Sequence, residues 1–372
     1  MSGVQDTALL RDWLAVLRAP GIGPVAFGRL LSQAKTPGDL LAAARDCGEL
    51  APATRAALRA PDWAAVDRDL AWAEGTDNHL LSLASPDYPA LLREIHAPPP
   101  VLFVHGNRAC LNHPQLAMVG SRNPTPGGED TAGAFAAHLA QVGLGITSGL
   151  ALGIDTACHR GALASGGLTL AVMGTGLDRV YPARNRALAH EIAAQGGALV
   201  SEFPGGTTPR PENFPRRNRL ISGLSLGVLV VEAAPRSGSL TTARHAVEQG
   251  REVFAVPGSI HNPLARGCHA LIRQGAKLVE TAADILEELG GLGDLAGPAP
   301  VPGPLSPGEV PGTPSPEHQQ LIDYMGFDPV TVDQLVVRSG LTTAAVSSML
   351  LILELQGQVS SQAGGRYVRS KT

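Results

Sequence analysis

The sequence predicts a doubly wound α/β domain with a mostly parallel sheet, placed between a helical N-terminal domain and a small C-terminal domain. Apolar residues recur every three or four positions over residues 7–73, which is typical of packed helices. From residue 79 onward, short apolar runs alternate with helical stretches, and this alternation indicates crossover units in a parallel sheet. A Gly/Pro-rich stretch over residues 290–316 then separates a third segment from the rest.

Composition limits the fold and the partners. The 372 residues include 44 Gly and 30 Pro, which favours several domains joined by turn-rich connections. Hydrophobic residues make up 44% but aromatic residues only 4%, so we expect a core of Ala, Leu and Val. The formal net charge is −4, and nucleic-acid binding would therefore require a local basic patch.

The cysteines and the hydropathy pattern indicate a cytoplasmic protein. Cys47, Cys110, Cys158 and Cys268 are scattered without zinc-ligand spacing, which suits a reducing compartment, and we expect no metal site. No segment reaches the ~18 apolar residues of a membrane span, and the N-terminus does not resemble a signal peptide. We therefore expect no membrane attachment.

The N-terminal domain, residues 1–78, is predicted to be all-α. Its turn Pro20-Gly21-Ile22-Gly23-Pro24 lies between two helical stretches and resembles the hairpin of helix-hairpin-helix proteins, whose glycine amides contact DNA phosphates. The match is partial because Phe27 stands where a small residue is expected. A purely structural turn remains an equal alternative.

The central domain, residues 79–290, is predicted to contain eight buried strands. The apolar runs that predict them cover residues 80–83, 101–104, 116–119, 144–147, 168–173, 198–201, 226–231 and 253–256. Helical stretches of ten or more residues separate most of these runs, so both faces of the sheet should be covered.

The C-terminal part divides into a linker over residues 291–316 and a domain over residues 317–372. Three helices are predicted over residues 317–324, 331–339 and 343–356, followed by a hairpin of residues 359–361 and 367–369. Three short helices followed by a two-stranded wing indicate a winged-helix domain.

The strongest functional signal is a basic motif at the start of a helix. It contains Phe214, Arg216, Arg217, Asn218 and Arg219, and it precedes the buried strand over residues 226–231. In an α/β sheet, ligands bind at the carboxyl ends of the strands, where helix N-termini converge. Guanidinium groups match phosphate oxygens in pairs, and an aromatic ring can stack a base. The alternative is an ordinary solvated basic helix face.

A second signal is the loop Gly120-Ser121-Arg122, which follows the strand over residues 116–119. Such a loop lets backbone amides approach a phosphate closely. It is neither a Walker loop nor a dinucleotide fingerprint, so the usual motifs for ATP hydrolysis and hydride transfer are missing, and we expect no cofactor.

Other strand ends carry small or polar residues that would extend one groove, which suits a polymeric ligand. Ser239 is as consistent with helix capping as with ligand contact, and Asp155 is better explained as a structural partner than as a catalytic acid. No nucleophile has a general base at a recognisable spacing. The sequence therefore favours a binding protein over an enzyme.

Taken together, these segments resemble the DNA-processing protein A family, also called DprA or Smf, over residues 85–289. The stretches that carry the resemblance are Tyr88-Pro89, Gly120-Ser121-Arg122, Ser148-Gly149-Leu150-Ala151, Gly174-Thr175-Gly176, Ser201-Glu202-Phe203-Pro204, Phe214-Pro215-Arg216-Arg217-Asn218-Arg219 and Gly250-Arg251-Glu252-Val253. The sequence departs from the family pattern at Leu152, where an arginine is usual.

The resemblance implies an extended Rossmann-type domain that binds single-stranded DNA, protects incoming strands during natural transformation in competent cells, and helps to load RecA recombinase during DNA recombination. It also implies a sterile-alpha-motif-like N-terminal module and a C-terminal winged helix as an accessory. The DNA-facing residues would be Gly120, Ser121, Arg122, Phe203, Phe214, Arg216, Arg217, Asn218 and Arg219. The family dimerises through the late part of this domain, so His269, Ile272, Arg273 and Leu278 are candidates for a homodimer interface.

Two rival functions are less consistent with the residues. A phosphoribohydrolase acting on nucleoside monophosphates would need a Pro-Gly-Gly-x-Gly-Thr loop followed by a glutamate, but Arg236-Ser237-Gly238-Ser239-Leu240-Thr241 stands there. A transcriptional regulator would need cations on its recognition helix, but residues 343–355 contain neither Lys nor Arg. Direct RecA contact, binding of double-stranded DNA and the ligand of the winged helix stay open.

Overall fold

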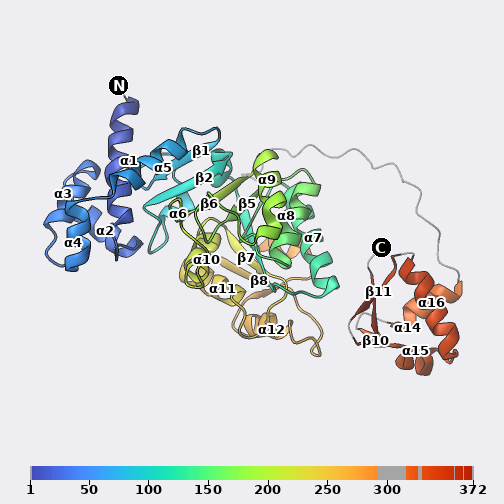
Figure 1. The fold of residues 1–372 in the computed structure, drawn as a ribbon. Helices are drawn as coiled ribbons and strands as arrows, with labels where there is room; N and C mark the ends of the chain where they lie inside the picture. Colours follow the sequence, from blue (N-terminus) through green and yellow to red (C-terminus); the bar gives the residue numbers. More distant parts are fainter. Residues whose placement is uncertain (1, 291–315, 326–328, 356, 363, 371–372) are drawn as a thin grey trace. The chain divides into compact units, whose positions relative to one another are not determined.

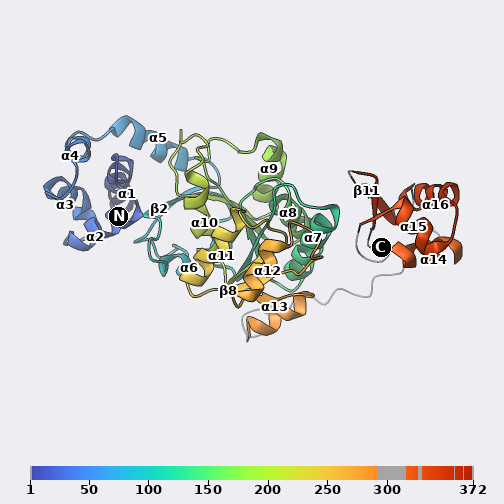
Figure 2. The same cartoon turned by 90° about the horizontal axis from the view of Figure 1, so that it is seen from below.

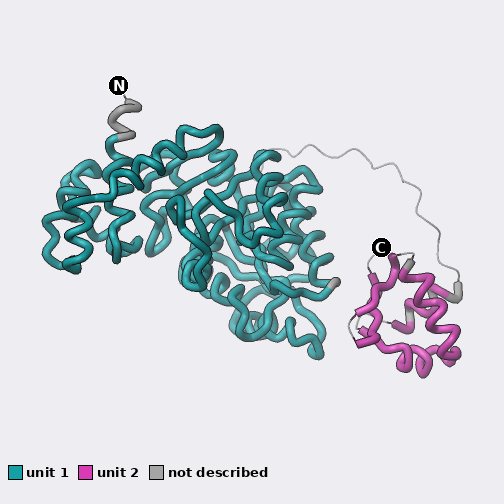
Figure 3. Tube along the Cα trace, viewed as in Figure 1, with its two compact units in different colours: residues 1–299 teal, residues 300–372 magenta. Residues whose placement is uncertain are grey.

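The computed structural model describes residues 2–290, 316–325, 329–355, 357–362 and 364–370. These residues belong to two compact units, residues 1–299 and residues 300–372 (Figure 3). The predicted linker over residues 291–316 lies outside the described residues, apart from Pro316.

The first unit begins with helices, as the three- and four-residue periodicity predicts. They are α1 (Ser2–Arg18), α2 (Pro24–Gln33), α3 (Leu40–Asp46), α4 (Pro52–Arg59) and α5 (Trp63–Ala73), with a 3₁₀ turn at Pro37–Asp39. We call residues 2–73 the helical region. Its core includes Trp13 and Phe27, whose ring centroids lie 5.2 Å apart. Gly21 makes the turn between α1 and α2 with a φ of +81°, a conformation that favours glycine.

A nine-stranded sheet follows the helical region (Figure 1). Its strands are β1 (Asn78–Ser82), β2 (Val101–Gly106), β3 (Gln115–Val119), β4 (Gly145–Ser148), β5 (Thr169–Val172), β6 (Ala198–Ser201), β7 (Gly227–Val230), β8 (Glu252–Ala255) and β9 (Lys277–Leu278). The spatial order is β1-β2-β6-β5-β4-β3-β7-β8-β9. All pairs from β6 to β9 are parallel, whereas β2 runs antiparallel to both β1 and β6. The predicted mostly parallel sheet is confirmed.

Helices cover both faces of this sheet (Figure 2). They are α6 (Ala90–Arg93), α7 (Pro126–Gln141), α8 (Ile154–Ala164), α9 (Arg186–Ala194), α10 (Asn213–Gly223), α11 (Ser239–Glu248), α12 (Arg266–Arg273) and α13 (Ala282–Glu288), with 3₁₀ turns at Arg108–Asn112 and Ala183–Asn185. Side chains alternate along β3, because Leu116 and Met118 pack in one core while Ala117 and Val119 pack in another. Burial on both faces explains why the strands read as continuous apolar runs.

The helical region is attached to the sheet through apolar contacts with β2. Val101 and Phe103 belong to the same buried cluster as Trp13 and Leu14, and the Trp72 and Phe103 rings lie 5.8 Å apart. Leu177, in the loop after β5, is partly buried against this cluster. The helices therefore share a core with the sheet instead of standing apart from it.

The second unit has the predicted order of three helices and a hairpin. Its elements are α14 (Pro316–Met325), β10 (Val330–Thr331), α15 (Val332–Ser339), α16 (Thr343–Leu355), β11 (Val359–Gln362) and β12 (Arg366–Arg369). The two-residue strand β10, which was not predicted, pairs with β12 and completes a sheet of order β10-β12-β11. Thr331 and Gln334 form a capping box at the start of α15, and Gly340 ends this helix in the left-handed conformation.

Across the described part of the chain, no single helix is long and apolar enough to cross a membrane. Only α15 and α16 taken together reach that length and composition, and they meet at a bend of 112°.

Candidate nucleic-acid interface

A cavity of about 710 Å³ opens between β3 and β7. After β3 the chain adds β4, β5 and β6 on one side of that strand, and it then adds β7, β8 and β9 on the other side. The loops after β3 and β7 line the cavity, together with the first turns of α10 and α11. Strands β3 and β7 are neighbours, but the chain leaves them toward opposite sides of the sheet, which opens a crevice at their carboxyl ends. The cavity is lined by six of the nine predicted DNA-facing residues: Gly120, Ser121, Arg122, Phe214, Arg217 and Asn218.

The loop after β3 is held firmly at its far end. The buried carboxylate of Glu232, just after β7, accepts hydrogen bonds from the backbone N–H of Thr125 at 2.9 Å and from its hydroxyl at 2.7 Å. The Thr125 hydroxyl in turn accepts from the Gly128 N–H and caps α7. Arg122 is exposed, and its guanidinium carbon lies 5.7 Å from the centroid of the Phe214 ring.

Arg217 lies at the floor of the cavity and is only 4% exposed. Its guanidinium donates to the carbonyl oxygens of Gly149 and Val172, at the ends of β4 and β5. A Cβ atom on Gly149 would lie 2.5 Å from an Arg217 nitrogen, so a larger residue there would force the Arg217 guanidinium to shift. Burial lowers the pKa of Arg217 to about 10, against the opposing effect of Asp155. The group therefore remains cationic near pH 7 and contributes a fixed positive charge beneath the cavity.

Asp155 has the structural role that its position predicts. One carboxylate oxygen accepts from the backbone N–H groups of Gly149 at 3.1 Å and Ala151 at 3.2 Å. Burial raises the pKa of Asp155, and the nearby Arg217 opposes this rise. The carboxylate thereby fixes the loop after β4, whose Gly149 carbonyl holds Arg217.

The other two arginines of the basic motif differ in what they contact. Arg219 forms a 2.5 Å ion pair with Glu202, a side chain only 3% exposed. Arg216 lies 3.8 Å from the same carboxylate, is 50% exposed, and stands over the Phe203 ring with its guanidinium carbon 5.2 Å from the centroid. Burial raises the pKa of Glu202, while Arg219 and then Arg216 oppose the rise. Arg219 thus neutralises the carboxylate and leaves Arg216 accessible to a ligand. Phe203 is buried beneath Arg216, outside the cavity.

Sequence reasoning missed two residues of the cavity wall. Tyr181 is 45% exposed, and its ring centroid lies 5.6 Å from that of Phe214. Arg236, after β7, is exposed at the mouth. Both follow strands of the parallel sheet, so the rule that ligands bind at carboxyl ends could have indicated them. Phe214 itself is seated against Gly174, where an added Cβ would lie 2.9 Å from the ring.

The remaining predicted residues lie elsewhere in the first unit. His269, Ile272 and Arg273 are on α12, and Leu278 is on β9 at the edge of the sheet opposite β1. Arg273 and Leu278 are exposed, while Ile272 is partly buried against the core. The hairpin residues 20–23 lie between α1 and α2, and Pro24 begins α2; all of them are outside the cavity.

The cavity has the chemistry of a site for a phosphate and a base. It brings together exposed and buried guanidinium groups, two adjacent aromatic rings and the amides of a Gly-Ser loop. Within the described ranges, no three His, Cys, Asp or Glu side chains gather as metal ligands.

Two family models match the chain. The model described as DNA recombination-mediator protein A matches residues 79–290, and the model described as DprA winged helix domain matches residues 305–365. The first match covers more than half of the chain.

Curated relatives agree with these matches. Protein Smf of Escherichia coli K12 is 47% identical over 306 residues, which are 82% of this chain and 80% of the relative. DNA processing protein DprA of Streptococcus pneumoniae is 47% identical over 201 residues, which are 54% of this chain and 71% of the relative.

Two solved structures are also similar. The X-ray structure of DprA from Streptococcus pneumoniae matches with a TM-score of 0.64 and 37% identity, over 74% of this chain and 97% of that one. DprA from Helicobacter pylori, described for its single-stranded DNA binding mode, matches with a TM-score of 0.52 and 30% identity, over 58% of this chain and 97% of that one. Fold, site chemistry and sequence similarity agree: the chain belongs to the DNA recombination-mediator protein A family, whose members are called DprA or Smf.

Proposed function

We propose that the protein binds single-stranded DNA along the rim formed by the carboxyl ends of β3, β5, β6 and β7. The observation that carries this proposal is the pairing of exposed cations with aromatic rings. Arg122 stands over Phe214, and Arg216 stands over Phe203. Phe214 is only partly buried, so Arg122 can contact a phosphate while the Phe214 ring stacks a base, which is the chemistry of single-strand binding. Phe203 is buried, so its ring supports Arg216 and does not stack a base. The Helicobacter pylori relative, described as binding single-stranded DNA, supports the assignment.

The nine predicted residues divide into two groups in this proposal. Gly120, Ser121, Arg122, Phe214, Arg216 and Asn218 contact the strand, and Tyr181 extends the stacking surface beside Phe214. Arg217, Arg219 and Phe203 are buried or half-buried and form the support. Arg217 does not contact the phosphate in this proposal, because its Nη1 donates to two protein carbonyls. It contributes positive charge beneath the phosphate.

Membership of the family supports a wider role, which we also propose. The protein would protect incoming single strands and load RecA recombinase during natural transformation and DNA recombination, acting by binding and without catalysis or a cofactor. It would act in the cytoplasm as a homodimer that associates through α12 and β9.

Fluorescence anisotropy of a labelled oligothymidylate, measured over a salt series, tests the binding proposal. The informative variant is Arg122→Ala/Arg216→Ala, because both side chains are exposed and their loss leaves no buried group unpaired. Each lost phosphate contact should reduce the slope of log K against log salt by about 0.7, and the affinity should fall about tenfold or more.

The matched control is Arg11→Ala/Arg29→Ala, which removes two exposed arginines of the helical region and changes the net charge equally. This control should bind like the wild type. Equal losses in both double variants would show that bulk charge and not the rim carries binding. A wild type that ignores the strand but binds a nucleoside monophosphate would favour the phosphoribohydrolase-like alternative.

A further inference from the structure

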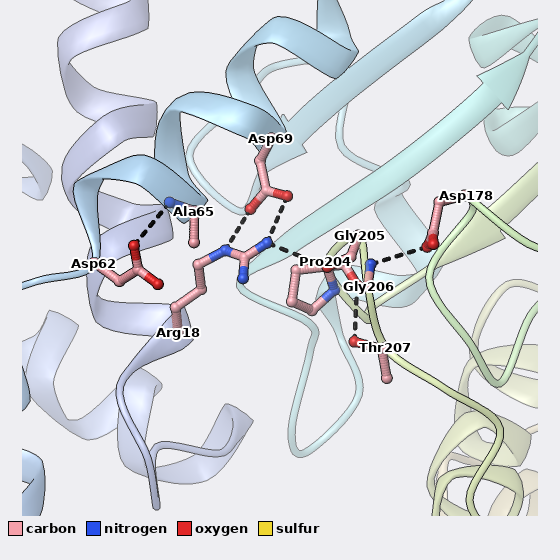
Figure 4. Close-up of polar contacts among 9 residues, drawn as sticks. All are labelled: Arg18, Asp62, Ala65, Asp69, Asp178, Pro204, Gly205, Gly206 and Thr207. Carbon is pink, nitrogen blue, oxygen red and sulfur yellow. Dashed lines mark hydrogen bonds and ion pairs between the residues drawn. The ribbon is translucent and has the colours of Figure 1, made fainter.

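One ion pair of the helical region is buried where this region meets the sheet (Figure 4). Arg18, at the end of α1, donates to Asp69 of α5 from Nε at 2.6 Å and from Nη2 at 2.7 Å. The two side chains are 19% and 4% exposed. The same two helices are also joined by the pair Arg11–Asp67, whose side chains are 46% and 56% exposed. We call Arg18–Asp69 the inner pair and Arg11–Asp67 the outer pair. Burying the inner pair costs desolvation free energy that the exposed outer pair does not, so joining the two helices does not by itself explain why the inner pair is buried.

The inner pair reaches a loop of the α/β part. Arg18 Nη2 lies 3.4 Å from the carbonyl oxygen of Gly205, the third polar partner of this guanidinium. Gly205 belongs to the segment 204–208 that follows β6, which we call the β6 loop (Figure 4). Asp62 caps α5 by accepting from the Ala65 N–H at 2.9 Å, which fixes the start of the helix that carries Asp69.

The β6 loop is bonded on its other side to the loop after β5. The Gly206 N–H donates to the Asp178 carboxylate at 3.0 Å, and the Gly176 N–H donates to the Thr207 carbonyl at 3.1 Å. Within the loop, the Thr207 hydroxyl donates to the Pro204 carbonyl at 2.7 Å. Two hydrogen bonds therefore join the two loops, one to the Asp178 side chain and one between backbone groups.

The same loops set the first turn of α10. The Asn213 side chain is 5% exposed and donates to the carbonyls of Thr208 at 3.3 Å and Gly174 at 3.1 Å. Phe214 follows directly and is seated against Gly174. A chain of contacts thus leads from Arg18 and Asp69 through the β6 loop to the aromatic ring of the proposed DNA site.

We propose that Arg18, paired with Asp69, is a positioning residue for DNA binding: it holds the β6 loop through Gly205 and so sets the first turn of α10. This inference rests on the proposed function. The helical region then helps to position the residues of the binding site. Its docking does not depend on the ion pair, because Trp72, Phe103 and Leu177 join it to the sheet through apolar contacts. Removing the pair should therefore loosen the β6 loop without detaching the helices.

The test uses the full chain with Arg18→Met/Asp69→Leu, which replaces both charges by apolar groups and leaves neither one unpaired. The control is Arg11→Met/Asp67→Leu on the same two helices. Hydrogen exchange by mass spectrometry should show amides of residues 203–214 exchanging about tenfold faster in the inner variant than in the control. The Kd for oligothymidylate should rise about three- to tenfold in the inner variant only, while both variants keep similar Tm values.

Arg18→Lys provides a second variant in case the double variant fails to fold. Lysine keeps a charge for Asp69 but lacks the planar fork that serves Asp69 and Gly205 together, so exchange of the β6 loop should again increase. Oligothymidylate affinity and loop exchange equal to those of the control would overturn the positioning role. A wild type without single-strand binding would instead overturn the proposed function, and the exchange measurement tells these two failures apart.

Discussion

The rim of the nine-stranded sheet and the exposed face of α16 are two surfaces on which a fold-based argument would place DNA, and they differ in chemistry. The rim presents Arg122 and Arg216 over aromatic rings. In winged-helix domains the second helix of the motif reads DNA, but α16 contains no Lys or Arg and exposes Leu351 at 59% and Ile352 at 38%. The comparison teaches that nucleic-acid binding must be argued from the side chains of a site, because a fold alone does not supply it.

The largest expected effect is a difference in stability between variants of a buried and an exposed arginine of the rim. Arg217→Ala should lower the free energy of unfolding by about 3–5 kcal/mol, because it leaves two buried carbonyls without their donor and Asp155 without a nearby cation. Arg216→Ala should change it by only about 0.5 kcal/mol. Denaturant unfolding followed by tryptophan fluorescence measures both, since Trp13, Trp63 and Trp72 all lie in the first unit. Similar losses in the two variants would contradict the division of the arginines into support and contact.

The next largest effect concerns the aromatic pair. Phe214→Ala and Tyr181→Ala should each weaken oligothymidylate binding by about 1–3 kcal/mol, or roughly 5- to 150-fold, because each removes a surface on which a base can stack. Tyr324→Ala, at an exposed aromatic residue of the second unit, is the matched control and should bind like the wild type. A loss confined to Phe214→Ala would limit the stacking surface to one ring.

A third effect is a pH dependence of the first unit. His159 is fully buried, its Nδ1 lies 2.7 Å from the Thr169 hydroxyl oxygen, and burial lowers the pKa of His159 from 6.5 to about 3. Between these values the unfolded chain binds a proton that the folded chain does not. The free energy of unfolding should therefore fall as pH falls below about 6.5, by up to about 1.4 kcal/mol per pH unit. Thermal unfolding by tryptophan fluorescence at pH 7 and pH 5 measures this slope, which should be shallower in His159→Gln.

The smallest expected effect concerns the exposed face of α16. Leu351→Ser/Ile352→Ser should leave affinity for single-stranded DNA within about twofold of the wild type, because neither side chain can neutralise a phosphate. Anisotropy with the same oligothymidylate is the measurement. A tenfold loss would place part of the binding surface on α16 and end the distinction drawn above.

Much of the fold could be predicted from the sequence because parallel strands buried on both faces leave continuous apolar runs. The run over residues 226–231 contains β7, for example, which is one residue shorter than the run at each end. Strand β9 was missed because Lys277 and Leu278 form no such run. The antiparallel direction of β2 was also not predictable, because nothing in its residues distinguishes it from the parallel strands.

The location of the candidate site was predictable from the sequence, but the division of its arginines into buried and exposed groups was not predicted. Arg217 precedes Leu220 and Ile221 by three and four residues, so helical periodicity places it on their buried face. The periodicity therefore indicated burial of Arg217, whereas its position between Arg216 and Arg219 favoured ligand contact. The partners of Arg219 and Arg18 could not be inferred, because Glu202 and Gly205 approach them from distant segments of the chain.

The two ends of the sheet have a consequence for how the protein behaves at high concentration. A sheet edge presents unpaired backbone groups that can template the addition of strands from other molecules. At one end β1 packs against α1 and α5, and at the other β9 is only two residues long. So short an edge offers too few backbone groups to start a continuous ladder. This edge therefore offers little to strand addition, and the association of copies that we propose at β9 would have to depend on side chains.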